Sequence, residues 1–252
     1  IEGGERAAEN EGRSKSMKTV AIITAAGAGI RMGGEQPKQF LELEGRPLLA
    51  FTLERFSRSA DIDGIVLVVP ADRVEYVRAE IVEKYNLGKV QHIVAGGERR
   101  QDSVRLGLEA TEGHYSLVLI HDGVRPLVSK HLIRRIVRAA QEYHAVIPAL
   151  PLKETVKEVD RAGLVIRTHD REYLRLVQTP QAFRYQEILE AHRRALEEHW
   201  EGITDDALLM ERTGIPVKII EGSEENIKIT TPRDFELARF LIGRMPKMPK
   251  MR

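Results

Sequence analysis

The sequence predicts an α/β protein: a mostly parallel, Rossmann-like sheet with helices on both faces and a projecting β-hairpin arm. Two observations predict the sheet, because short runs of Val, Ile and Leu recur along the chain and stretches with helical apolar spacing separate them. A third observation predicts the arm, since this alternation stops after residue 151 and a segment rich in Val, Thr and Ile follows.

The expected strands are short apolar runs bounded by turn residues or by helical patterns. In chain order they lie at 19–24, 64–69, 90–94, 116–120, 145–150, 216–220 and 226–230. The longest apolar runs are far too short to cross a bilayer. We therefore expect these segments to be strands of a soluble domain that makes no membrane contact.

The expected helices have apolar residues three or four positions apart. In chain order they lie at 48–56, 71–85, 100–110, 130–143, 185–200 and from Pro232 onward. Asp72 stands in the first turn of its helix, where a negative charge is favourable, and Pro232 suits a first helical position.

The arm is expected at about 151–175. Residues 152–170 form a hairpin pattern with the sequence DRAG, at 160–163, as its turn. An isolated hairpin is only marginally stable in water, and one face of this hairpin is mostly charged. We therefore expect the arm to pair with a second copy of the chain and to form a homodimer.

Composition indicates how the chain is divided, whether it binds nucleic acid and where it is located. Residues 1–16 are polar and lack the apolar stretch of a secretory signal, so we expect a disordered extension or a cloning remnant there. We expect a single domain over 17–244 and a frayed tail at 245–252. A formal net charge of +1 argues against nucleic-acid binding, and the lack of Cys agrees with a cytoplasmic location.

The sequence AAGAGIRMGGEQPKQF, at 25–40, follows the first strand and contains the cations Arg31 and Lys38. Small residues let a backbone approach a ligand closely, and successive amides can hold phosphate. The Walker pattern fails because Pro37 precedes Lys38 and Gln39 follows it. The dinucleotide pattern fails because Met32 replaces its third glycine. A polyphosphate site is favoured over a merely structural turn.

The same loop resembles the A-A-G-x-G-x-R-M and P-K signature of nucleotidyltransferases. More narrowly, segments at 96–104, 121–126, 178–183, 204–207 and 221–234 resemble the cytidylyltransferase family that acts on 2-C-methyl-D-erythritol 4-phosphate in the non-mevalonate isoprenoid pathway. The resemblance implies that CTP and this phosphorylated polyol give the CDP-alcohol and pyrophosphate. It also implies attack by a substrate phosphate oxygen on the α-phosphorus of CTP, with no protein nucleophile.

The resemblance also assigns roles to residues. The catalytic residues it implies are Arg31, Lys38 and Lys228. The nucleotide-binding residues it implies are Ala25, Ala26, Gly27, Ala28, Gly29, Gly97, Glu98, Arg100, Ser103, Asp122 and Gly123. Asp122 and Glu225 would hold Mg²⁺ or another divalent cation. Thr155 and Arg171, on the arm, would bind the second substrate in the neighbouring subunit's site.

Each role has a structural alternative. The cations can be solvated surface charges, Asp122 a turn residue before glycine, Ser103 a helix-capping residue and Thr155 a simple strand former. Two other functions also stay open: a ribitol 5-phosphate cytidylyltransferase on the same scaffold, and a nucleotide-sensing domain without catalysis. A Rossmann dehydrogenase is excluded by the missing third glycine.

Overall fold

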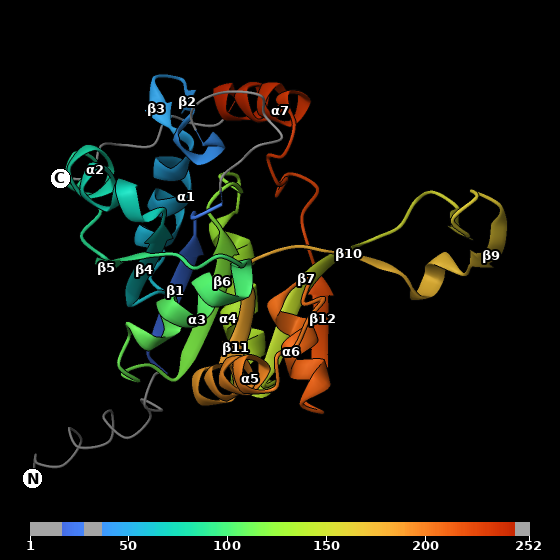
Figure 1. Cartoon of the computed structure of the whole chain (residues 1–252). Coiled ribbons are helices and arrows are strands. Elements are labelled where there is room, and N and C mark those ends of the chain that lie inside the picture. Colours follow the sequence, from blue (N-terminus) through green and yellow to red (C-terminus); the bar gives the residue numbers. More distant parts are fainter. Residues whose placement is uncertain (1–16, 28–36, 245–252) are drawn as a thin grey trace, which may run out of the picture.

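The computed structural model describes residues 17–27 and 37–244, which form a sheet with helices on both faces (Figure 1). Within these residues the main sheet has eight strands. They are β1 (Thr19–Thr24), β4 (Gly64–Val69), β5 (Val90–Ala95), β6 (Leu117–Asp122), β7 (Ala145–Pro151), β10 (Arg175–Val177), β11 (Gln181–Arg184) and β12 (Val217–Glu221). Their order is β10-β7-β11-β6-β1-β4-β5, and β12 pairs with β7. The predicted α/β class is confirmed.

The strands β6, β1, β4 and β5 run parallel to one another. The register pairs Thr24 with both Val68 and Asp122, so the carboxyl ends of three strands meet at one edge of the sheet. In an open α/β sheet this is the edge at which ligands bind. The strands β10 and β11 are antiparallel to β7, and β11 is also antiparallel to β6, which makes the sheet mixed.

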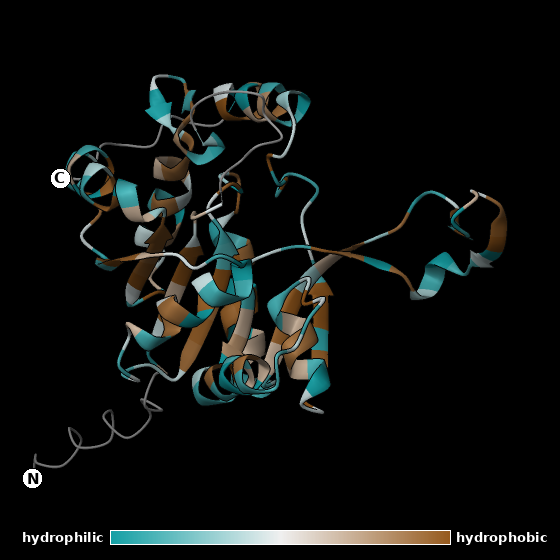
Figure 2. Cartoon of the chain, in the orientation of Figure 1, coloured by the Kyte–Doolittle hydropathy of each residue, from teal (hydrophilic) through white to brown (hydrophobic). Residues whose placement is uncertain are grey.

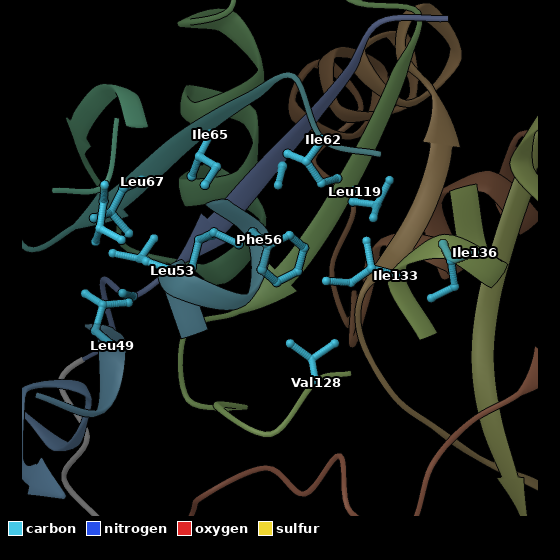
Figure 3. Close-up of a cluster of buried hydrophobic side chains, with 14 of the residues drawn as sticks. Leu49, Leu53, Phe56, Ile62, Ile65, Leu67, Leu119, Val128, Ile133 and Ile136 are labelled. Carbon is cyan, nitrogen blue, oxygen red and sulfur yellow. The ribbon is translucent and has the colours of Figure 1, made fainter. Parts of the chain in front are cut away.

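Two layers of helices cover the sheet. The longer helices are α1 (Leu48–Ser57), α3 (Arg100–Glu109), α4 (Lys130–Glu142), α5 (Tyr185–Glu197), α6 (Asp206–Arg212) and α7 (Pro232–Gly243). Side chains of β1 alternate between two cores, as a strand requires. Ala21 and Ile23 face the core of α1 and α4, whereas Val20 and Ile22 face that of α3, α5 and α6. Figure 3 shows the first core around Phe56.

The helix expected at 71–85 has three different parts. A 3-10 turn, η3 (Ala71–Arg73), leads into one α-helical turn, α2 (Val74–Val77), and then into a π-helical segment, η4 (Arg78–Glu83). Val77 and Ile81 are both fully buried in the first core. Their spacing of four positions places both side chains on the same face of the helix.

The arm is a two-stranded hairpin that projects far from the sheet (Figure 1). Its strands, β8 (Val156–Val159) and β9 (Val165–His169), pair antiparallel, and Gly163 occupies the turn with φ of +83°. The 3-10 turn η5 (Arg171–Tyr173) leads the chain back to β10. The hairpin and its turn are therefore as predicted.

One expected strand is wrong, because residues 226–230 pair with no strand of the described chain. The segment is extended, but its contacts are individual: the Ile229 amide donates to the Val124 carbonyl at 3.0 Å. Ile229 itself is buried in a third core under α7. This core also joins the short hairpin of β2 (Glu42–Leu43) and β3 (Arg46–Pro47), which follows the 3-10 turn η2 (Lys38–Phe40).

Among the described residues, no helix combines the length and the apolar character that crossing a bilayer requires.

The core of α3, α5 and α6 leaves no room for a side chain at Gly107 of α3. A Cβ atom there would lie 2.7 Å from Ile22 Cγ2 and 2.9 Å from Val68 Cγ2, both on central strands. Replacing a helical glycine by alanine normally stabilises a helix, but here we expect Gly107→Ala to lower the free energy of unfolding by about 1–3 kcal/mol. Urea denaturation measures this change.

The control is Gly88→Ala, because a Cβ atom at Gly88 meets no atom of residues 17–27 and 37–244 within 4 Å. We expect this variant to unfold at nearly the wild-type urea concentration. Equal stability of the two variants would contradict the packing described here.

Candidate active site

A cleft of about 600 Å³ opens at the carboxyl edge of the parallel strands. It is formed by the loops after β1, β5 and β6 and by the extended segment before α7. Its described lining consists of Thr24, Ala25, Ala26, Gly27, Lys38, Gln39, Gly97, Glu98, Arg99, Arg100, Ser103, Asp122, Val124 and Lys228. The structure thus brings together most of the nucleotide-binding and catalytic residues expected from the sequence.

The first wall is the backbone of residues 25–27. The Ala25 amide donates to the Val68 carbonyl at 2.7 Å, which ties the loop to β4. Among the described residues, nothing lies within 4 Å of the position that a Cβ atom on Gly27 would take, and Gly27 lines the cleft. Lys38 approaches the same cleft from η2. Ala28, Gly29 and Arg31, also expected here, lie outside the described residues.

The second wall is the loop between β5 and α3. A Cβ atom on Gly96 would lie 2.3 Å from Ala26 Cβ, so only glycine lets this loop touch the first wall. The Ser103 hydroxyl accepts a hydrogen bond from the Gly97 amide at 3.1 Å. Ser103 lies inside α3, whose N-cap is Arg99, so it holds the loop and does not cap the helix. Exposed Glu98 stands at the cleft rim.

Asp122 ends β6 at the bottom of the cleft and is almost fully buried. Lys228 Nζ lies 2.9 Å from its Oδ2, Arg125 Nε lies 3.5 Å from Oδ2, and Arg100 Nε lies 3.5 Å from Oδ1. Burial alone would raise the pKa of Asp122, but the charges of Arg100, Lys228 and Arg125 lower that pKa well below its usual value. Asp122 is therefore a fixed anion.

Arg100 connects Asp122 to a carboxylate that sequence reasoning left out of the site. Its Nη1 lies 2.7 Å from Asp206 Oδ2, and His192 Nε2 contacts Asp206 Oδ1 at 3.1 Å. Burial would lower the pKa of Arg100, yet Asp206 and Asp122 raise it above its usual value. The neighbouring Asp205 caps α6, because its carboxylate accepts a hydrogen bond from the Leu208 amide at 3.2 Å.

Neutral His121 holds the loop that carries Asp122. Its Nε2 must donate to the Arg125 carbonyl at 3.2 Å, so its Nδ1 accepts from the Thr179 hydroxyl at 2.9 Å. The same hydroxyl accepts from the Asp122 amide. Gly123 packs under the loop, because a Cβ atom there would lie 3.1 Å from Ala25 Cβ, and Gly123 is not part of the described cleft lining.

A second cleft, of about 470 Å³, continues the first one. Three charged residues, Arg100, Asp122 and Lys228, line both clefts. The other described lining residues of the second cleft are Arg125, Ile147, Val177, Gln178, Thr179, Gln181, Thr204, Asp205, Leu208 and Glu211. Two ligands bound side by side would meet at the shared charged residues.

Three expected site residues lie elsewhere. Thr155 and Arg171 are exposed on the arm, where the Arg171 guanidinium donates to the Lys153 carbonyl, and neither lines a described cleft of its own chain. Glu225 is exposed three residues before Lys228 and is absent from the described lining of both clefts. Their proposed roles stay predictions.

A divalent cation fits this site only together with phosphate oxygens. No group of three or more His, Asp or Glu residues in the described part of the chain could hold a metal ion. Asp122 nevertheless offers carboxylate oxygens, the ligands that Mg²⁺ prefers, and one carboxylate with substrate phosphates is a common arrangement. Asp122 is the residue that would hold such an ion.

A glycine-rich loop and a ring of cations at this sheet edge define the class of protein, an α/β nucleotidyltransferase. The chain matches the family profile of 2-C-methyl-D-erythritol 4-phosphate cytidylyltransferase over residues 19–244. It is 48% identical to the enzyme of that name from Geobacter metallireducens over 229 residues, which cover 90% of this chain and 98% of the relative. The relative from Pelotomaculum thermopropionicum is also 48% identical, over 89% of this chain and 94% of its own.

Solved structures agree with these relatives. The crystal structure of 4-diphosphocytidyl-2C-methyl-D-erythritol synthase from Anaerococcus prevotii has 38% identity and a TM-score of 0.80, covering 91% of this chain and 97% of that one. The cytidylyltransferase structure from Thermus thermophilus has 36% identity and a TM-score of 0.71, covering 88% and 98%. The chain therefore belongs to the 2-C-methyl-D-erythritol 4-phosphate cytidylyltransferase family.

The burial of neutral His121 predicts a loss of stability in mild acid. Burial lowers the pKa of His121 to about 3, from 6.5 for the free side chain. The unfolded chain therefore takes up a proton first as the pH falls, and stability is lost from about pH 6.5 downward. Between pH 7.5 and 5 we expect His121 to account for a loss of about 2 kcal/mol in the free energy of unfolding.

Urea denaturation at the two pH values measures this loss, with His121→Asn as the comparison. The variant should be less stable at pH 7.5 but should lose less on acidification, because its unfolded state lacks this proton site. An equal loss in both proteins would contradict the assignment. Buried Asp122 and Asp206, whose pKa values are lowered, add their own losses only at lower pH.

Proposed function

We infer that the protein joins CTP to 2-C-methyl-D-erythritol 4-phosphate and releases pyrophosphate. The observation that carries this inference is the pair of continuous clefts that share Arg100, Asp122 and Lys228. A nucleotide in the first cleft and a phosphorylated polyol in the second would place their reacting phosphates at the shared charges. The ribitol 5-phosphate alternative is not favoured, since the relatives reported above carry the methylerythritol name.

The proposed reaction is a single displacement. A phosphate oxygen of the polyol forms a bond to the α-phosphorus of CTP, and the bond from that phosphorus to the bridging oxygen breaks. The electron pair leaves with pyrophosphate, and no protein side chain is bonded to phosphorus. Catalysis then consists of holding two anions in line and neutralising their charge.

The basic residues are proposed to bind different phosphates. We assign Lys38 and Arg31, on the first loop, to the phosphates of CTP, where a point charge and a planar guanidinium can both contact oxygen. Lys228 lies between the clefts and is 40% exposed, so it can turn from Asp122 to the phosphates that meet there. Ala25, Ala26, Gly27, Gly97, Glu98, Arg100 and Ser103 keep their proposed role around the nucleotide.

Asp122 is the proposed ligand of Mg²⁺ or another divalent cation, which would neutralise phosphate charge when bound. Glu225 remains a weaker candidate for the same ion. The substrate phosphates would compete with Asp122 for Lys228 and Arg100, and the cation would compete with these basic residues for Asp122. The residues must therefore exchange partners during binding.

The proposed homodimer completes the site. Thr155 and Arg171 stand on the arm and line no described cleft of their own chain. Figure 2 shows apolar segments on the arm. At its base Tyr173 is 83% exposed and Leu176 52%. These apolar side chains would be covered by a second copy, whose cleft the arm would then reach. A cytoplasmic location stays a prediction from the sequence.

The function is tested by pyrophosphate release with Mg²⁺, in which CTP, UTP, ATP and GTP are each combined with methylerythritol phosphate and with ribitol 5-phosphate. We expect release only with CTP and methylerythritol phosphate. Release with ribitol 5-phosphate alone would overturn the assignment of the second substrate, and no release from protein that binds CTP would favour a sensing domain.

Removing the shared lysine should slow the reaction strongly. We expect Lys228→Ala to lower kcat/KM by about 10²–10³-fold, because one positioned charge at developing phosphate charge has an effect of this size. The control is Lys218→Ala, whose ammonium group lies over the Tyr143 ring and lines neither described cleft. A loss below threefold for Lys228→Ala would refute the role of Lys228.

Mixing two inactive variants tests the shared site. We expect Arg171→Ala and Lys228→Ala to be nearly inactive alone. A mixed dimer would contain one intact site, built from the Arg171→Ala cleft and the Lys228→Ala arm, so an equal mixture should regain about a quarter of wild-type activity. No recovery, from chains shown to exchange in solution, would place the arm's residues in their own chain's site.

A further inference from the structure

Two buried glutamines each hold the backbone of one wall of the site through hydrogen bonds. Gln39 is 2% exposed and Gln178 is 6% exposed. A primary amide offers two N–H donors and one carbonyl acceptor, so one side chain can bond several backbone groups at once. Both glutamines use these groups on segments that carry cleft residues.

Gln39 holds the backbone of the glycine-rich loop. Its Nε2 donates to the Ala25 carbonyl at 2.7 Å and to the Gly27 carbonyl at 2.9 Å. Because a trans peptide unit is planar, the Ala26 N–H points opposite to the Ala25 carbonyl, and hence away from Gln39. The bond from the Ala25 amide to Val68 fixes the loop from its other side. Gln39 thereby fixes the direction of the Ala26 N–H, which can donate a hydrogen bond to a phosphate oxygen.

Gln178 holds the segment that leads to Lys228. Its Oε1 accepts from the Ser223 amide at 3.1 Å, and its Nε2 donates to the Ser223 carbonyl at 2.8 Å, which reproduces the two bonds of a strand pair. A Cβ atom on Gly222 would lie 2.4 Å from Gln178 Oε1, so the approach is close. Next to Gln178, the Thr179 carbonyl accepts from the Asn226 amide group at 2.7 Å. Lys228 follows two residues later.

We propose that Gln39 and Gln178 are separate positioning residues, Gln39 for CTP through the loop at 25–27 and Gln178 for the second substrate through Lys228. The proposal rests on the function inferred above, in which CTP binds in the first cleft and the second substrate in the second cleft. Loss of either side-chain amide leaves buried backbone groups without partners, so the wall can leave its binding geometry. We expect this to raise the Kd or KM of the substrate concerned about tenfold.

The test compares Gln39→Leu with Gln178→Leu in two measurements. The first is the Kd of CTP with Mg²⁺, measured by titration calorimetry without the second substrate. The second is the KM of methylerythritol phosphate at saturating CTP. We expect Gln39→Leu to raise the Kd of CTP about tenfold and Gln178→Leu to leave it within twofold. For the KM of methylerythritol phosphate we expect the opposite: Gln178→Leu should raise it about tenfold and Gln39→Leu should leave it within twofold.

The matched control is Gln141→Leu, which replaces an exposed glutamine of α4 outside both described clefts and should change neither constant. A purely structural role would lower the stability of both variants and change both constants alike. That outcome, or an unchanged Kd of CTP in folded Gln39→Leu, would overturn the proposal.

A second variant serves if Gln39→Leu does not fold. Gln39→Glu keeps the shape, and its carboxyl group can donate one hydrogen bond only when protonated. Burial against two carbonyl oxygens should raise the pKa of this carboxyl group from about 4.3 toward the range between pH 6 and pH 8. Relative to wild type, its Kd for CTP should therefore be raised more at pH 8 than at pH 6, and an equal rise at both would overturn the role of Gln39. If wild-type protein binds CTP but turns over neither polyol phosphate, the inferred function fails, whereas the calorimetric comparison still tests Gln39.

Discussion

The neutralisation of the buried Asp122 carboxylate by three cations is the interaction on which the site depends. Arg100, Arg125 and Lys228 come from three different segments and contact this one group at 2.9–3.5 Å. A buried anion without such partners would be costly, so the charges hold the β5–α3 loop, the β6 loop and the segment before α7 together. The same charges stand where two phosphorylated substrates would meet.

The sheet makes this convergence possible. Parallel β1, β4, β5 and β6 end at one edge. Glycines at 96, after β5, and at 123, after β6, let these two loops pack against Ala26 and Ala25. The arm lies far from this edge (Figure 1), which explains why its two proposed substrate residues have no partner in their own chain's clefts. The proposed dimer would bring these two residues to the cleft of the second copy.

The sequence predicted what local pattern and short separation determine. The parallel strands were found because their apolar runs are continuous, and the glycine-rich loop because its residues are adjacent. The strands β10 and β11 were missed because they have only three and four residues, too few for a strand pattern to stand out. The alternation at 226–230 suggested a strand, although isolated contacts hold that segment. Asp206 was left out of the site because its partner Arg100 lies 106 residues away in the chain.

The central claim is that the site positions two phosphates and supplies no nucleophile of its own. The most direct measurement is the stereochemistry at the α-phosphorus, with CTP in which one α-oxygen is replaced by sulfur in a single configuration. A single in-line attack predicts inversion of that configuration in the product. Retention would require two displacements, and therefore a covalent enzyme intermediate, and would contradict this account.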